Sequence, residues 1–311
     1  MSLNLRRIIY STLFGLFLIF APTSGPSSSA AYGETNLVGI MISREIRPFI
    51  QMVEGLESSL NMPICRIFLD TNGRPYSADP RIEKVKPELF TAMVAVGPGA
   101  LRYVTLHHWP GPKVFGMVLD PEKIVHKGAV PCGVSLNIPY QQEIVAIHRV
   151  FPNVRRLGVL FNPANNEIWF EKARETAGTY GMVLTALTVR EQSEISHFFE
   201  DDNLHVDAVM FIPDRTVISK AVIQFVIKKA ILRGIPVIGY NRFFHNSGAA
   251  LSFAIDYRAI GEDVALQLKA LLRGEPCAIL TPKYKLLLNM RAVNNLGLIL
   301  GEELPDELEK D

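Results

Sequence analysis

Polar side chains that suit small-molecule binding stand where predicted β-strands end. In an open parallel sheet, ligands bind beyond the carboxyl ends of the strands, where loops enter helices and N–H groups point outward. The same residue types are ordinary helix caps, so each position alone carries little weight, but their recurrence favours one binding edge. The set comprises Ser43, Asp120, Asn162, Asn165, Asp214, Arg215, Thr216, Tyr240, Asn241 and Asp256.

A glycine-rich helix start adds a candidate anion seat. The segment Gly97-Pro98-Gly99-Ala100 follows the third predicted strand and opens a helix that runs to Leu106. Proline suits the first helical turn, and glycine lets the backbone approach an anion closely. The same pattern also occurs as plain turn chemistry. We treat Gly97, Gly99 and Ala100 as candidate contacts to a carboxylate or phosphate.

The chemistry of this set suits a zwitterion. Donors and a helix N-terminus would hold a carboxylate, Asp214 or Asp256 an amine, and Tyr240 or Trp169 an apolar group. A helix N-terminus contributes about 0.3–1 kcal/mol to an exposed anion, whereas micromolar affinity needs roughly 8 kcal/mol. We therefore expect two lobes to close over the ligand.

The sequence carries no common motif of catalysis or nucleotide binding: GxSxG, the P-loop, GxGxxG and HExxH are absent. The adjacent His107 and His108 point in different directions on a helix or strand, so they do not form a metal-binding pair. Cys65, Cys132 and Cys277 allow at most one disulfide, and we expect all three to be buried small hydrophobic side chains. We predict no enzymatic activity, no metal and no cofactor.

The first 31 residues differ from the rest. Two arginines precede an uncharged apolar run of fourteen residues from Ile8 to Ala21, and small residues follow up to Ala31. This run is shorter than the roughly 20 residues of a spanning helix, so residues 1–31 are predicted to be a secretory signal peptide, with an uncleaved anchor as the alternative. The remaining chain has 30 basic and 31 acidic side chains, without the positive excess of nucleic-acid-binding proteins.

Short β-branched runs alternate with amphipathic segments from residue 37 onward, which is typical of parallel sheets built from βαβ units. A first series of strands is expected at Leu37–Ser43, Ile64–Leu69, Ala92–Val96 and Val114–Leu119, with helices at Pro48–Leu60 and Pro98–Leu106. A second series is expected at Leu157–Phe161, Val183–Val189, Ala208–Ile212 and Pro236–Tyr240, with helices at Tyr140–Phe151, Glu167–Tyr180, Ser193–Asp201 and Ile218–Arg233. Two series predict two doubly wound α/β lobes, with a (β/α)₈ barrel as the alternative.

The C-terminal part continues the pattern. We expect a strand at Ala250–Ala254, a helix at Tyr257–Leu272, a strand at Tyr284–Leu288 and a short helix at Met290–Leu296. The acidic tail after Gly301 is expected to be frayed.

Several stretches between Gly133 and Leu296 match the pattern of a known family. They are Leu157–Asn162, Asp207–Val209, Pro213–Val217, Gly234–Val237, Phe253–Tyr257 with Gly261, and Asn289–Ala292. These stretches resemble the TrpX-type ABC transporter substrate-binding proteins, which have the type I periplasmic binding fold. In the first lobe the match is weaker: Gly97–Ala100 resembles a Gly-Thr-Pro-Ala segment that opens a helix at the ligand, and Asp120-Pro121 resembles an Asp-Pro pair.

The resemblance implies two lobes joined by a three-strand hinge. It places residues 32–138 plus 252–278 in an N-terminal lobe and residues 139–251 plus 279–311 in a C-terminal lobe. By the same resemblance, the ligand is a small carboxylate-bearing metabolite, with an amino acid preferred, captured by hinge closure and delivered to an ABC permease in the membrane. We expect a monomer, exported to the periplasm or an equivalent extracytoplasmic space, that binds no nucleic acid.

Two departures from the family pattern bear on the ligand. Arg44–Arg47 stands where relatives often carry a His-Pro pair, and Asn241 stands where they often carry Asp, which weakens the expected amine site. The alternatives are a ligand-sensing module for a membrane receptor and a secreted enzyme that uses Asp120, Asp214 or Asp256 as acid or base.

Overall fold

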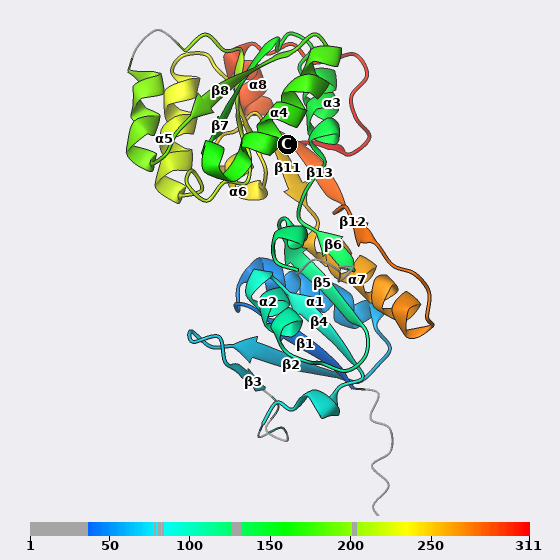
Figure 1. Ribbon diagram of the computed structural model, residues 1–311. Helices are drawn as coiled ribbons and strands as arrows, with labels where there is room; N and C mark the ends of the chain where they lie inside the picture. Colours follow the sequence, from blue (N-terminus) through cyan, green and yellow to red (C-terminus); the bar gives the residue numbers. More distant parts are fainter. Residues whose placement is uncertain (1–36, 78, 80–81, 83, 126–131, 201–203) are drawn as a thin grey trace, which may run out of the picture. The chain divides into compact units, whose positions relative to one another are not determined.

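The computed structural model describes residues 37–77, 79, 82, 84–125, 132–200 and 204–311. The expected signal peptide, residues 1–31, lies outside the described residues. Over the described part, the chain forms two β-sheets, each with helices on both faces (Figure 1). The predicted α/β class with two doubly wound lobes is confirmed, and two separate sheets exclude the single closed barrel.

The first sheet has seven strands. They are β1 (Val38–Ile42), β2 (Ile64–Leu69), β3 (Pro75–Ser77), β4 (Ala92–Val96), β5 (Lys113–Val118), β6 (Gly133–Ser135) and β12 (Ile279–Leu280). Their order across the sheet is β12-β6-β5-β4-β1-β2-β3, and every pairing is parallel except that of β2 with β3. The sequence patterns predicted β2 and β4 to the residue but missed the short strands β3, β6 and β12.

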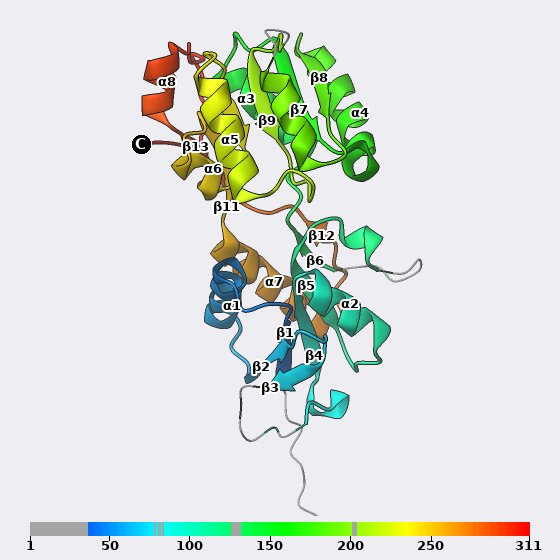
Figure 2. The same ribbon diagram turned by 90° about the vertical axis from the view of Figure 1, so that its left-hand side faces the viewer.

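Helices cover the first sheet on opposite faces because successive side chains of a strand alternate in direction. Ile40 packs with α1 (Arg47–Ser59) and α7 (Tyr257–Leu272), whereas Met41 packs with α2 (Pro98–Leu106). Helices α1 and α7 lie side by side in both views (Figures 1 and 2). Their close approach requires glycine, since a Cβ at Gly261 would lie 1.9 Å from the Met52 carbonyl oxygen.

The second sheet also has seven strands. They are β7 (Arg156–Phe161), β8 (Val183–Thr188), β9 (Ala208–Phe211), β10 (Val237–Gly239), β11 (Leu251–Ile255), β13 (Tyr284–Leu288) and β14 (Leu308–Lys310). Their order is β14-β13-β11-β10-β9-β7-β8, with only the β11–β13 pairing antiparallel. The pattern of β-branched runs therefore located the main strands of both sheets.

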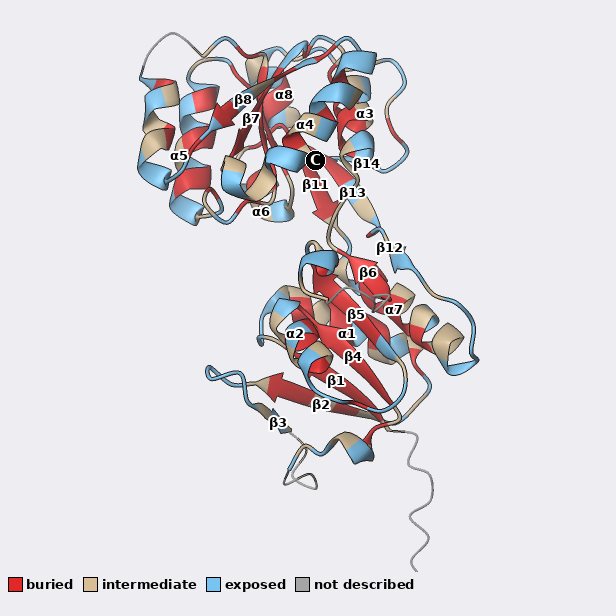
Figure 3. Ribbon diagram, viewed as in Figure 1, coloured by how far each residue is buried: buried red, intermediate tan, exposed pale blue. Residues whose placement is uncertain are grey.

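The helices of the second sheet also divide between its two faces. They are α3 (Tyr140–Val150), α4 (Pro163–Thr179), α5 (Lys220–Ile231), α6 (Arg242–Asn246) and α8 (Met290–Leu296), with the 3₁₀ segment η3 (Gln192–Phe199). Helices α3, α4 and α8 pack with Val159 and Phe161, whereas α5, α6 and η3 pack with Val209 and Phe211. Figure 3 shows the resulting pattern, with buried residues on the strands and exposed residues on the outer sides of the helices. None of the helices in the described ranges combines the length and apolar character that a membrane span needs.

The chain passes between the two sheets three times: from β6 to α3, from β11 to α7 and from β12 to β13. Strand β11 pairs within the second sheet and β12 within the first, so the expected segment limits at 252 and 279 fall inside strands of the other lobe. The limits suggested by sheet membership lie near residues 256 and 281 instead.

The tail after Gly301 is not frayed, contrary to expectation. Strand β14 pairs in parallel with β13, and Leu308 packs against the core of the second lobe. The carboxylate of Asp311 accepts a hydrogen bond from the Met290 backbone N–H at 3.1 Å and lies 2.9 Å from the Nε2 atom of His245. Apolar anchors among the acidic residues explain this order.

The expectation for the cysteines is wrong at two positions. Cys132 and Cys277, separated by 145 residues, form a disulfide beside the adjacent strands β6 and β12. The third cysteine, Cys65, is buried and contacts the Ser77 hydroxyl at 3.3 Å. The pairing depends on the crossover that brings the two short strands together, and neither strand was apparent in the sequence.

Candidate functional site

A cavity of about 770 Å³ lies at the carboxyl ends of strands from both sheets. Its lining begins with Leu119 and Asp120 after β5, Asn137 after β6, Ile212 after β9 and Tyr240 after β10. The first turns of α3 and α7 and the N-terminal half of α4 also line it. Its position agrees with the rule for open parallel sheets, and its volume falls within the ~300–1,000 Å³ usual for small-molecule sites.

Aromatic side chains supply much of the apolar wall. Tyr140, Trp169, Tyr240 and Tyr257 line the cavity. The rings of Tyr140 and Trp169 meet edge to face with centroids 6.5 Å apart, and Tyr240 packs on Phe244 at 4.8 Å. Burial raises the pKa of Tyr240 and of Tyr257, so both hydroxyls are neutral at physiological pH. Such a wall suits an apolar or aromatic ligand group.

Asp120 lies in the cavity lining and is held in place by two hydrogen bonds and an ion pair. Its backbone adopts a left-handed conformation with φ of 46°. The Asn137 side chain accepts a hydrogen bond from the Asp120 N–H at 2.8 Å and donates one to its carboxylate at 2.7 Å. Lys123 forms an ion pair with the same carboxylate at 2.7 Å. The carboxylate of Asp120 is therefore already engaged within the first lobe.

Asp214 does not line the cavity but fastens the loops beneath it. Its side chain is only 2% exposed, and its carboxylate accepts four hydrogen bonds. The donors are the backbone N–H groups of Asn162 and Thr216 and the side-chain amides of Asn165 and Asn166, at 2.7–3.1 Å. Four donors satisfy a carboxylate. The structure does not support the predicted role of Asp214 as a partner for a ligand amine, because protein donors already occupy its carboxylate oxygens.

The residues around Asp214 share this structural role. Asn162 caps α4 by accepting from the Ala164 N–H at 3.0 Å, and Thr216 accepts a bond from the Asn162 amide at 3.1 Å. Arg215 is exposed and outside the cavity lining. Of the predicted residues in this network, only Asn165 lines the cavity, where it is joined by its neighbour Asn166. The capping Asn162 also explains why α4 begins at Pro163, four residues before the expected start at Glu167.

The predicted anion seat at Gly97–Ala100 lies outside the cavity lining. Ser43 donates a hydrogen bond to the Val96 carbonyl at 2.9 Å and accepts one from the Ala100 N–H at 2.7 Å, so that N–H is occupied. Gly97 has φ of 87°, and a Cβ there would lie 2.5 Å from the Phe49 ring. Glycine is needed here because of the backbone conformation and the close packing. The structure does not support a role for these residues in binding a ligand carboxylate.

The remaining predicted residues divide between the two roles. Asp256 is exposed and caps α7 through the Ala259 N–H at 3.0 Å. Asn241 lines the cavity while its side-chain oxygen caps α6 through the Phe243 N–H at 2.9 Å. Of the thirteen predicted site residues, the cavity brings together Asp120, Asn165, Tyr240 and Asn241.

Glu143 is the cavity residue that the sequence reading missed. It lies in the first turn of α3, lines the cavity and is only 4% exposed. Burial away from water raises the pKa of the Glu143 carboxyl to about 8. A signal did exist: Glu143 precedes the buried Ile147 and Val150 by four and seven residues, which places a charge on the apolar side of an amphipathic helix.

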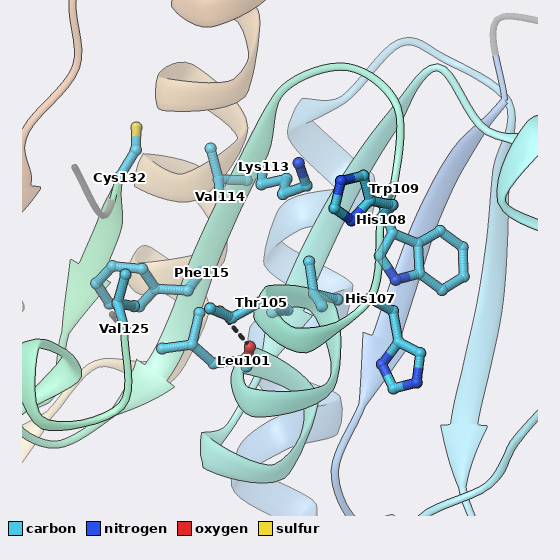
Figure 4. Close-up of a pocket in the computed structure, with 12 residues that line it drawn as sticks. Leu101, Thr105, His107, His108, Trp109, Lys113, Val114, Phe115, Val125 and Cys132 are labelled. Atoms are coloured by element: carbon cyan, nitrogen blue, oxygen red, sulfur yellow. Dashed lines mark hydrogen bonds between the residues drawn. The ribbon is translucent and has the colours of Figure 1, made fainter. Parts of the chain in front are cut away.

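A smaller cavity of about 270 Å³ lies within the first lobe (Figure 4). The rings of His107 and His108 lie apart in it, as expected for adjacent residues. The described residues hold no cluster of three or more metal-ligating side chains. The lining of this cavity reaches Val125 and Cys132, on either side of a segment that the structure does not describe, so we assign no site to it.

Comparison with known proteins identifies the family and the fold. The family model described as ABC transporter substrate binding protein matches residues 116–310. No curated protein matches the chain. Three solved structures match over 89% of this chain and 99% of their own chains. One is a conserved domain protein from Vibrio cholerae, with 22% identity and a TM-score of 0.62, and another is an ABC domain in complex with L-Trp from Streptococcus pneumonia, with 17% identity and a TM-score of 0.62. The third is the ligand-free, open form of a substrate-binding protein with adhesive properties from Clostridium difficile, with 16% identity and a TM-score of 0.69. At these identities the likeness establishes the fold, which is the expected type I periplasmic binding fold.

Proposed function

The chain belongs to the ABC transporter substrate-binding protein family, and we propose that it is the solute receptor of an ABC importer that captures an amino acid in the cavity at the strand ends. The protein would be exported by the segment 1–31 and act outside the cytoplasm as a monomer that delivers its ligand to a membrane permease. It would have no role in binding nucleic acid.

The observation that carries the proposal is the lining of the 770 Å³ cavity by both lobes, with aromatic walls and a few polar groups. An amino acid offers an apolar side chain and polar ends that match this division. The Streptococcus pneumonia neighbour was solved with L-Trp bound, which supports a ligand of this class.

Hinge closure supplies the affinity that one lobe lacks. Burying an apolar side chain contributes ~1.5–3 kcal/mol, and excluding water strengthens polar contacts in the closed cavity. The three connections between the sheets are the segments that would bend. Binding would therefore be coupled to approach of the lobes, and the permease would read the closed form.

The three aspartates that could serve as a catalytic acid or base are engaged in other interactions. Asp214 is saturated by four donors, Asp256 is an exposed helix cap, and Asp120 is engaged by Asn137 and Lys123. A catalytic acid or base must be able to reach the substrate with a spare proton or lone pair. We therefore propose that the ligand leaves unchanged.

Native mass spectrometry of freshly purified protein tests this function. We expect a retained small molecule with the mass of an amino acid, and an increase in Tm when that compound is added to ligand-free protein. Absence of any retained ligand, together with no change in Tm across a panel of amino acids and other metabolites, would contradict the proposal, as would conversion of the ligand to a product.

A further inference from the structure

Glu143 is a buried carboxyl group without a partner. Among the residues that the structure describes, none donates a hydrogen bond to it and no cationic side chain lies within ion-pair distance. A buried ionisable group that is neither paired nor hydrogen-bonded is unfavourable, and such groups call for an explanation outside the stability of the fold. Because Glu143 lines the cavity, the missing partner can come from a ligand.

The other carboxylates of the cavity lining are either hydrogen-bonded within the protein or exposed to solvent. Asp120 is bound by Asn137 and Lys123, while Glu122 and Glu167 lie at exposed positions of the lining. Asn241 carries no charge. Glu143 is thus the carboxyl group of the lining that is both buried and available.

The basic groups of the lining are also peripheral. Lys123 has a side chain that is 64% exposed and is paired with Asp120, and Lys172 is exposed. No arginine is present among the cavity residues. The interior of the cavity therefore offers one carboxyl group and several aromatic faces, which together favour a positively charged nitrogen on an apolar framework.

We infer that the Glu143 carboxylate binds the protonated amino group of the ligand, and that the ligand is a primary amine carried by an aromatic or branched apolar group. The inference rests on the proposed function and specifies its ligand class. Glu143 takes the place of the acidic residue that the family pattern led us to expect at position 241. Trp169 of α4 and Tyr140 of α3 line the same cavity and would contact the apolar part of the ligand.

Binding by this route moves one proton. Glu143 is protonated in the empty cavity below about pH 8, so a cationic amine must displace that proton, which passes to the buffer while the amine keeps its own. Tyr284 of β13, which is influenced by the charge of Glu143, has a pKa raised to about 12 by burial, with smaller contributions from Glu307 and Glu143, and stays neutral. The other acidic and basic side chains that line the cavity are those of Asp120, Glu122, Lys123, Glu167 and Lys172.

Isothermal titration calorimetry with matched ligand sets tests the inference on the full-length protein freed of ligand. One set is L-tryptophan, tryptamine and indole-3-propionate; the other is L-leucine, isoamylamine and 4-methylpentanoate. Each set keeps the apolar group and removes the carboxylate or the amine in turn. We expect the amine-bearing members of at least one set to bind and the acids without an amine to bind at least about tenfold more weakly.

The variant Glu143→Gln keeps the shape of the side chain and removes the charge. It should weaken the amine-bearing ligands at least about tenfold. The matched control Glu175→Gln, an exposed carboxylate of α4 outside the cavity lining, should change affinity by less than about threefold. For the wild-type protein at pH 7, titrations in buffers of different ionisation enthalpy should show release of about one proton per ligand. Loss of that release in Glu143→Gln would distinguish a contact from a purely structural effect.

Several results would overturn the inference. Acids without an amine could bind as well as the amines, Glu143→Gln could bind as the wild type does, or the wild type could bind without releasing a proton. A retained ligand that lacks a basic nitrogen would also refute it while leaving the solute-binding role intact. If no member of either set binds and no ligand is retained, both proposals fail.

Discussion

Two buried carboxyl groups of the same lobe, Asp214 and Glu143, have opposite surroundings. Asp214 is 2% exposed and accepts four hydrogen bonds, whereas Glu143 is 4% exposed and has none from any described residue. The two carboxyl groups are therefore similarly buried but differ in their roles. A satisfied carboxylate organises loops, and an unsatisfied one at a cavity is held for a partner from outside.

The largest effect should follow from removing the satisfied group. In Asp214→Ala, two backbone N–H groups and two side-chain amides lose their acceptor, which should lower the free energy of unfolding by about 3–4 kcal/mol. Urea denaturation measures this loss. Asp256→Ala, which removes an exposed helix cap, should cost only about 1 kcal/mol. A similar small loss for both variants would show that the Asp214 network contributes no more than an ordinary cap.

The unsatisfied group should behave in the opposite way. The pKa of Glu143 is about 8 in the folded protein and about 4.3 when unfolded. Between these values the folded state holds a proton that the unfolded state has lost, so stability falls as pH rises from about 4 to 8. Glu143→Gln removes that dependence and should be more stable than the wild type at pH 8, with no difference near pH 4.

Denaturant titrations across this pH range give the measurement for ligand-free protein. Glu167→Gln should retain the wild-type pH profile, since its parent side chain is exposed. Destabilisation by Glu143→Gln at pH 8 would mean that the carboxylate has an internal partner and that the contrast with Asp214 is false.

The aromatic wall should affect binding more than folding. Trp169→Ala should weaken the ligand by roughly 10- to 100-fold, because an indole face at the cavity is lost. Calorimetry measures the change. Tyr180→Ala, at the far end of α4 and outside the cavity lining, should leave affinity unchanged. Equal affinities for wild type and Trp169→Ala would move the apolar part of the ligand away from α4.

The smallest effect concerns the helix start in the first lobe. Ser43→Ala removes the hydroxyl that joins Val96 to Ala100 and should lower stability by about 1 kcal/mol without changing affinity. Ser58→Ala, which removes a hydrogen bond within α1, provides the comparison. A tenfold loss of affinity in Ser43→Ala alone would restore Gly97–Ala100 as an anion seat.

The main elements could be predicted because their patterns are local. Short apolar runs located β2, β4 and β13, and amphipathic spacing located α7, to the residue. The two-residue β12 and the disulfide between Cys132 and Cys277 depend on contacts between distant segments, for which the sequence has no periodic signal.

The site was predicted in position but only partly in composition. Polar residues do gather at the strand ends, yet the sequence cannot distinguish an oxygen that faces a ligand from one that faces a backbone N–H. Asp214 shows this, since the residues it binds on α4 precede it by about 50 positions. Glu143 shows the converse, because its charge on an apolar helix face was a local signal that strand-end reasoning passed over.

A crystal structure of the protein with its bound ligand tests the central claim most directly. The account predicts a basic nitrogen of the ligand within about 2.7–3.2 Å of the Glu143 carboxylate, an apolar group against Trp169, and Asp214 still bonded to its four donors. A ligand bound through Asp214 or at Gly97–Ala100, with Glu143 left without contact, would contradict it.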